Sequence, residues 1–148
     1  MEPLKVYFKN KKAQLTKGSP KSAGLDVVYC GEEDIKLNPT MRALLPTGIH
    51  MVIPDGYEMQ VRPRSGLALK HGLTVLNSPG TIDSDFRGEV GVILVNTSCK
   101  AVIIKPGSRI AQLAFNKIED PVIIPISKEE LEEEETERGD GGFGSTGE

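Results

Sequence analysis

The segment EVGVILVNTSCKAVIIKPGSRIAQLAF, residues 89–115, decides the fold because it alternates short apolar runs with turns. The runs EVGVILVN, KAVIIKP and RIAQLAF are rich in Val, Ile and other residues that favour extended backbone. The residues between them, Asn96-Thr97-Ser98 and Pro106-Gly107, are typical of turns. The segment is therefore predicted to form short strands joined by tight turns.

The same rhythm continues along the rest of the chain. The other short apolar runs are LKVYF (4–8), LDVVY (25–29), DIKL (34–37), RALLPTGIHMVI (42–53), YEMQVRP (57–63), LTVLN (73–77) and PVIIPI (121–126). Turn residues such as Asn38-Pro39 and Pro54-Asp55-Gly56 separate them. The pattern predicts an all-β sandwich or barrel. Within this body, a helix of about two turns is predicted for GLALKHG, which follows Ser65.

Length and composition indicate one domain and a cytoplasmic protein. A chain of 148 residues suits a single domain. We expect no secretory signal and no membrane span, since no run approaches about 20 apolar residues. Cys30 and Cys99 match no metal spacing and are expected to be reduced thiols. A zinc site that combines them with His50 and His71 is an alternative that the spacing does not support.

Charge divides the chain into a body and an acidic tail. The net charge is −3, but residues 129–148 are rich in Glu and contain one basic residue, Arg138. The remainder is mildly basic, which suits an anionic ligand but is too weakly patterned to predict nucleic-acid binding. We predict a β-barrel domain over 1–126, an acidic spacer over 127–137 and a glycine-rich arm over 138–148.

The first two motifs that could carry chemistry lie in the N-terminal half. SAGLDVV (22–28) places Asp26 at the start of a strand, where a simple turn aspartate is the alternative. RPRSGLALKHG, which begins at Arg62, places Arg64 immediately before Ser65 opens a helical turn. Backbone N–H groups at a helix start, a serine hydroxyl and an arginine fork together can hold a phosphate. Surface arginines beside an N-cap are the alternative.

The third motif, NSPGTIDSDFRGEV (77–90), is typical of a hairpin. Asp83 and Asp85 lie two residues apart and share a face if the chain is extended. One of them could act as a general base that activates water. Solvated loop carboxylates are the alternative.

The fourth motif, PGSRIAQLAF, is a turn that leads into a strand. Strict alternation predicts Arg109, Ala111 and Leu113 on one face, and Ile110 and Gln112 on the other. A glutamine on an otherwise apolar face usually has a buried hydrogen-bond partner or a ligand.

The fifth motif is the tail ETERGDGGFGSTGE (135–148). Arg138 can pair with a phosphate and Phe143 can stack on a base. Plain disorder is the alternative. Upstream, Ser127 and Glu130 have capping-box spacing, but no apolar face follows them. A solvated spacer is therefore favoured over a stable helix.

The five motifs together resemble a known family. AGLD, RPRSGLA, GTIDSDFRGE, GSRIAQL and RGDGGFGSTG, in this order, closely resemble the five motifs of the trimeric deoxyuridine triphosphatases, the dUTPases. The resemblance runs from about Ser22 to Gly147. It implies an all-β, jelly-roll-like distorted barrel of the β-clip type, a homotrimer and a flexible C-terminal arm. Two chains would form each interfacial active site, and the arm of the third would close it.

The resemblance also implies a reaction. The enzyme would hydrolyse dUTP to dUMP and diphosphate, which keeps uracil out of DNA and supplies dUMP for dTMP synthesis. Asp83 matches the general base that orients and deprotonates the water attacking the α-phosphorus. Mg²⁺ is implied as a cofactor chelated by the substrate triphosphate, with Asp26 reaching it through metal-bound water. The ligands are dUTP and dUMP, and no direct protein metal site, nucleic-acid partner or membrane partner is expected.

Further residues match the family's substrate contacts. For the phosphates these are Arg64, Ser65, Gly66, Gln112, Arg138, Gly144, Ser145 and Thr146. For uracil and the deoxyribose they are Asn77, Gly80, Thr81, Ile82, Asp83, Phe86, Gly91 and Phe143. Phe86 stands where the family usually has tyrosine, so the ring that packs on the deoxyribose is kept and the phenol is lost. Asp85 and Arg87 are expected to support the hairpin.

Two other functions are compatible with parts of this pattern. A dCTP deaminase, a related trimer, needs a glutamate on the strand after the hairpin, but GVILV (91–95) has Ile93 near that place. Its second motif is typically Arg-Ser-Ser, whereas this chain has Arg-Ser-Gly. A non-catalytic binding module would have lost Asp83, Arg64 or the arm, and all three are present.

Overall fold

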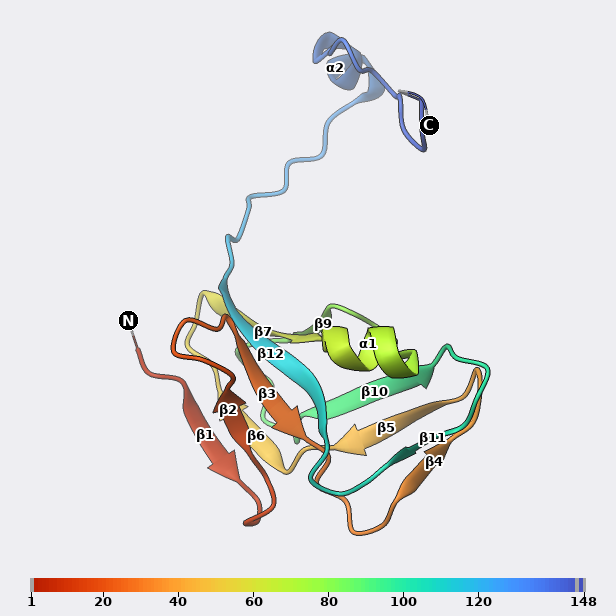
Figure 1. Ribbon diagram of the computed structural model, residues 1–148. Coiled ribbons are helices and arrows are strands. Elements are labelled where there is room, and N and C mark those ends of the chain that lie inside the picture. Colours follow the sequence, from red (N-terminus) through yellow and green to blue (C-terminus); the bar gives the residue numbers. More distant parts are fainter. Residues whose placement is uncertain (1, 146, 148) are drawn as a thin grey trace.

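A computed structural model describes residues 2–145 and Gly147 (Figure 1). The strands are β1 (Lys5–Phe8), β2 (Leu15–Lys17), β3 (Gly24–Val28), β4 (Ile35–Leu37), β5 (Arg42–Pro46), β6 (Ile49–Val52), β7 (Tyr57–Arg62), β8 (Leu73–Val75), β9 (Gly80–Ile82), β10 (Gly91–Asn96), β11 (Val102–Ile104) and β12 (Arg109–Lys117). The helices are α1 (Ser65–His71) and α2 (Lys128–Glu133). The prediction of an all-β fold is confirmed, and α1 forms where a short helix was predicted.

The strands form antiparallel sheets around one core. The largest sheet has the order β2-β3-β12-β7-β9, and a second has the order β5-β10-β8. The pairs β1-β6 and β11-β4 complete the body. This arrangement is the jelly-roll-like fold that was expected. No helix in the described part of the chain is long and apolar enough to cross a membrane.

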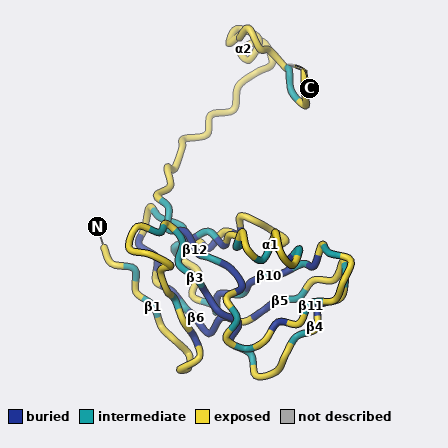
Figure 2. The backbone as a smooth tube through the Cα atoms, viewed as in Figure 1, coloured by how far each residue is buried: buried dark blue, intermediate teal, exposed yellow. Residues whose placement is uncertain are grey.

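Period-two burial explains the core. On β10, the buried residues Val92, Leu94 and Asn96 alternate with Gly91, Ile93 and Val95, which are only half-buried. Figure 2 shows the buried positions gathered between the layers of the body and almost none in the tail. The outward side of β10 is thereby left to form part of a cavity wall.

The apolar run 42–53 breaks into β5 and β6 at Thr47 and Gly48. Gly48 has φ of 68°, which favours glycine. A Cβ there would lie 2.9 Å from both the Ala13 Cβ and the Cys30 Sγ. A tight turn pinned against the core therefore divides what looked like one long strand.

The prediction of a strand at PVIIPI (121–126) is wrong for this chain. After β12 ends, the connector is extended and exposed, with Val122 and Ile123 more than four-fifths accessible. Within the described residues no strand pairs with it. A strand requires a neighbour for its backbone hydrogen bonds, and apolar composition alone does not supply one.

The acidic spacer contains a helix that sequence reasoning did not favour. Ser127 Oγ accepts from the Glu130 N–H at 3.1 Å, and the Glu130 carboxylate accepts from the Ser127 N–H at 2.7 Å. Both hydrogen bonds lower the pKa of the Glu130 carboxyl below its ordinary value, and the bond from the Ser127 backbone has the larger effect. The reciprocal cap suffices for a short helix without an apolar face.

The tail contributes little to the stability of the body. Every hydrogen bond and ion pair that the described residues of 127–147 make is with that same segment. Truncation after Ile126 should therefore shift the thermal unfolding midpoint by less than about 2 °C. Circular dichroism melts of both proteins check this, and a fall of more than about 5 °C would contradict it.

Candidate active site

The first cavity, called here the arginine cavity, has a volume of about 200 Å³. It lies between β3, β12 and the start of α1. Its lining residues are Gly18, Ser22, Gly24, Asp26, Arg64, Ser65, Gly66 and Gln112. All of the predicted phosphate contacts in the body, and Asp26, therefore meet in one place.

Asp26 is the electrostatic centre of the arginine cavity. Arg64 Nε donates to its Oδ1 at 3.0 Å, and Arg109 Nη1 lies 3.4 Å from its Oδ2. The Asp26 side chain is 14% exposed, which strengthens these interactions relative to surface pairs. Two guanidinium groups against one carboxylate leave a positive excess, which suits a bound anion.

The predicted face of Arg109 is wrong because β12 carries a bulge. The register with β3 shifts between Arg109 and Ala111, so strict alternation fails there. Ile110 and Ala111 are consequently both buried. Arg109 reaches the carboxylate of Asp26. Asp26 is the cross-strand partner of Gln112, so Arg109 lies on the face of Gln112 and not on that of Ala111. The bulge therefore brings a second arginine to Asp26, although Arg109 does not line the arginine cavity itself.

Gln112 has a hydrogen-bond partner, as its position predicted, although the bond is only partly buried. Its Nε2 donates to the Pro63 carbonyl at 2.9 Å. Its amide lies across Gly24, where a Cβ would overlap the Gln112 Oε1. Gly24 therefore provides the room in which Gln112 crosses from β12 to the segment that leads into α1.

The start of α1 presents polar groups to the same cavity. Arg64 is the N-cap residue, with extended backbone and no capping bond from its side chain. The first intrahelical bond runs from the Ala68 N–H to the Arg64 carbonyl. The N–H groups of the first turn have no intrahelical acceptor in any α-helix, and Ser65 and Gly66 are exposed. They can therefore donate to a ligand beside Arg64.

The second cavity, called here the hairpin cavity, has a volume of about 170 Å³. Its lining residues are Val61, Asn77, Gly80, Thr81, Ile82, Asp83, Phe86, Glu89, Val90 and Gly91. This set holds all the predicted nucleoside contacts of the body. The structure thus brings Asp83 together with the residues matched to uracil and the deoxyribose.

The hairpin has an outgoing and a return limb. In the outgoing limb, residues 80–83, β9 pairs with β7 and forms the edge of the largest sheet. The return limb, residues 86–91, begins at Phe86, a 44% exposed residue whose ring covers Gly88. Arg87 Nη1 donates to the carbonyls of Ser84 and Phe86, so it supports the hairpin as expected.

The two cavities lie on opposite faces of β7. Val61 is buried and lines the hairpin cavity, whereas Arg62 is exposed and faces the other way. On the Arg62 face, Ser65 and Gln112 of the arginine cavity also line a cavity of about 480 Å³. The arginine and hairpin cavities share no lining residue. One chain therefore presents two separate cavities.

A family model for dUTPase matches residues 10–147. The chain belongs to the dUTPase family. The deoxyuridine 5'-triphosphate nucleotidohydrolase of Chlamydia pneumoniae is 56% identical over 129 residues, which are 87% of each chain. That of Fusobacterium nucleatum is 55% identical over 126 residues, 85% of this chain and 84% of the relative. The dUTPase of Staphylococcus bacteriophage 80alpha with dUPNHPP has a TM-score of 0.82 and 26% identity, and each chain covers 100% of the other.

The tail of this dUTPase lies away from both cavities. Figure 1 shows the connector leaving the body after β12 and carrying α2 and residues 134–145 away from it. Arg138 Nε donates to the Gly141 carbonyl at 2.8 Å, and Phe143 is fully exposed. Gly144 and Ser145 share its turn. Thr146 lies outside the described residues.

Sequence reasoning missed several residues of the dUTPase cavities. Val61, Glu89 and Val90 complete the hairpin cavity, and Gly18, Ser22 and Gly24 complete the arginine cavity. Ser22 and Gly24 fall inside the motif SAGLDVV, and Glu89 and Val90 fall inside NSPGTIDSDFRGEV. These four residues could have been predicted from their place inside the motifs, whereas Gly18 lies outside all five motifs.

Among the described residues, no cluster of three or more His, Cys, Asp or Glu side chains could hold a metal. Cys30 is buried and Cys99 is exposed, and both are free thiols. The lining of the arginine cavity offers oxygen donors from Asp26, Ser22 and Gln112. Such a set fits an ion that keeps several waters and takes its other ligands from phosphates.

Substitution at Gly24 tests the arginine cavity. Gly24→Ala should displace Gln112 from the Pro63 carbonyl and weaken binding of inorganic triphosphate about tenfold. Gly18→Ala is the matched control, because its Cβ would meet the Ser22 Oγ at an ordinary 3.6 Å. Calorimetric titration provides the measurement. Equal affinities in Gly24→Ala and wild type would show that Gln112 does not shape this site.

Proposed function

We propose that this dUTPase hydrolyses dUTP to dUMP and diphosphate at a site composed of half-sites from neighbouring copies. The separation of the two cavities across β7 carries the proposal. Nucleoside and triphosphate are parts of one substrate, so the hairpin cavity of one copy must face the arginine cavity of another. The arrangement supports the homotrimer with interfacial sites.

The hairpin cavity suits a uracil base. Because β9 is the edge strand of its sheet, its outer edge offers main-chain donors and acceptors to a ligand. Such groups can match the pairing edge of uracil, whereas cytosine would leave them unpaired. Gly80 leaves room for the Asn77 amide, whose Nδ2 would lie 3.2 Å from a Cβ there. Phe86, at the start of the return limb, would pack on the deoxyribose.

The arginine cavity suits the triphosphate. Arg64 provides a guanidinium held in place by Asp26, and Ser65 and Gly66 add donors. Gln112 would contact the region of the α-phosphate. Mg²⁺ chelated by the triphosphate would neutralise part of its negative charge. Asp26, whose oxygens are already engaged by Arg64 and Arg109, would reach the ion through a bound water.

Asp83 would act on the attacking water. Asp83 is exposed at the end of β9 and lines the hairpin cavity. Within the described residues it forms no ion pair. A carboxylate is a far weaker base than hydroxide, so its negative charge and its orientation of the water in line with the α-phosphorus would contribute more than its proton affinity. The same carboxylate would accept the proton that the water loses.

The tail would complete the site from a third copy. The body, 1–126, is followed by the spacer, 127–137, and the arm, 138–148. The exposed, extended connector gives the arm the reach to leave its own body. Arg138 would pair with the γ-phosphate and Phe143 would stack on uracil, with Gly144 to Thr146 adding phosphate contacts.

The reaction has a cellular consequence. Removal of dUTP keeps uracil out of DNA, and the product dUMP supplies dTMP synthesis. The two free thiols suit a reducing compartment, and we place the enzyme in the cytoplasm.

Removing the proposed base tests the chemistry. Asp83→Asn should lower turnover of dUTP about a hundred- to ten-thousandfold while binding changes little, because shape is kept and basicity lost. Diphosphate release and equilibrium titration with dUTP measure the two effects. Asp55→Asn is the matched control, because Asp55 is also exposed and lines neither cavity. Near-normal turnover in Asp83→Asn would refute the assignment of the base.

Mixed assemblies test whether the arm acts in trans. Asp83→Asn chains and chains lacking 136–148 should each be nearly inactive alone. After subunit exchange, verified by native mass spectrometry, the mixture should regain diphosphate release from dUTP. Some sites would then combine an intact Asp83 with an arm from another copy. Exchange without recovery would indicate that the arm closes over the Asp83 of its own chain.

A further inference from the structure

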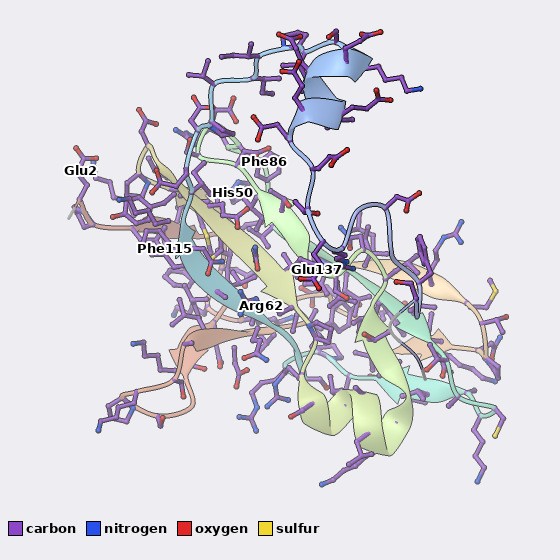
Figure 3. All side chains as sticks on the ribbon, turned by 90° about the horizontal axis from the view of Figure 1, so that it is seen from above. Glu2, His50, Arg62, Phe86, Phe115 and Glu137 are labelled. Atoms are coloured by element: carbon purple, nitrogen blue, oxygen red, sulfur yellow. The ribbon has the colours of Figure 1, made fainter. Side chains whose placement is uncertain are left out.

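A short segment outside the five motifs holds the return limb of the hairpin. Residues 47–50, called here the clamp, make four hydrogen bonds with residues 87–90. These are Thr47 Oγ1 to the Val90 carbonyl at 2.6 Å, the Gly48 N–H to Glu89 Oε1 at 2.7 Å, the Val90 N–H to the Ile49 carbonyl at 2.8 Å, and His50 Nδ1 to the Arg87 carbonyl at 3.0 Å. Figure 3 shows the side chains of the body from above, with His50 of the clamp and Phe86 at the start of the return limb labelled.

The clamp is itself fixed to the core. Thr47 and Ile49 have no exposed surface. The Lys9 N–H donates to the Gly48 carbonyl at 2.8 Å, and Gly48 lies tightly against Ala13 and Cys30. A well-packed interior yields little to small forces, so the clamp is a rigid support.

The clamp contacts the return limb of the hairpin cavity, whereas the outgoing limb is held by another strand. Phe86, Glu89, Val90 and Gly91 of the return limb line the cavity. Asp83 belongs to the outgoing limb, which is positioned by the pairing of β9 with β7. A change in the clamp should therefore alter how the nucleoside fits without removing the group that acts on water.

We propose that Thr47 is a positioning residue that sets the selectivity of the hairpin cavity for uracil over thymine. The inference rests on the proposed hydrolysis of dUTP. Thymine differs from uracil by one methyl group, and a pocket rejects such a group only if its walls do not yield. The Thr47 hydroxyl donates to the carbonyl of the buried Val90 and accepts from the Ile49 N–H at 3.3 Å. It therefore links the return limb, which lines the hairpin cavity, to the clamp.

Thr47→Val removes the hydroxyl and keeps the shape of the side chain. The KM for dUTP should rise, kcat should change by less than about threefold, and the ratio of kcat/KM for dUTP to that for dTTP should fall about tenfold. Thr47→Ser, which retains the hydroxyl, should restore the ratio. Ile104→Val, a buried substitution on β11 remote from the hairpin cavity, controls for lost stability and should leave the ratio unchanged.

A Thr47→Val enzyme that keeps the wild-type ratio would overturn the inference while leaving the proposed function intact. Equal losses in Thr47→Val and Ile104→Val would likewise overturn it, because they would reflect stability alone. Should Thr47→Val not fold, His50→Ala removes a clamp contact from a partly exposed side chain, and an unchanged ratio there is decisive against the inference. A wild-type enzyme that releases no diphosphate from dUTP would overturn the proposed function, and the inference with it.

Discussion

The alternation of side chains along β7 is the constraint on which the rest of the molecule depends. Val61 points into the hairpin cavity and Arg62 points to the opposite face, towards Ser65 and Gln112. A strand cannot turn neighbouring residues to the same side without a bulge. The residues proposed to bind a nucleoside and those proposed to bind its phosphates are therefore separated within each chain. Under the proposed function, association of copies brings the two sets to one substrate.

Different interactions hold the walls of the two cavities in place. In the arginine cavity, the carboxylate of Asp26 holds Arg64 and Arg109, and Gly24 allows Gln112 to cross the sheet. In the hairpin cavity, main-chain pairing fixes the outgoing limb, and the clamp of residues 47–50 fixes the return limb. The first cavity relies on charge, which suits phosphates, and the second on backbone shape, which suits selection among similar bases.

Much of this could be predicted from the sequence, because the signals were local. Short Val- and Ile-rich runs between turn residues located most strands, and the Ser65 helix start was visible in RPRSGLALKHG. The bulge at Arg109 was not predictable, since it follows from the pairing of β12 with β3. The apolar run PVIIPI was predicted to be a strand, but a strand requires a neighbour, and no strand of the described residues pairs with this run. The separation of the cavities required the three-dimensional register of β7.

The central claim is that one substrate is bound by more than one copy of the chain. A crystal structure with a non-hydrolysable dUTP analogue and Mg²⁺ tests it most directly. The account predicts uracil in the hairpin cavity of one copy, beside Asp83, and the phosphates at Arg64 and Gln112 of its neighbour. A complex in which a single chain supplies both the Asp83 and the Arg64 contacts to one analogue molecule would contradict it.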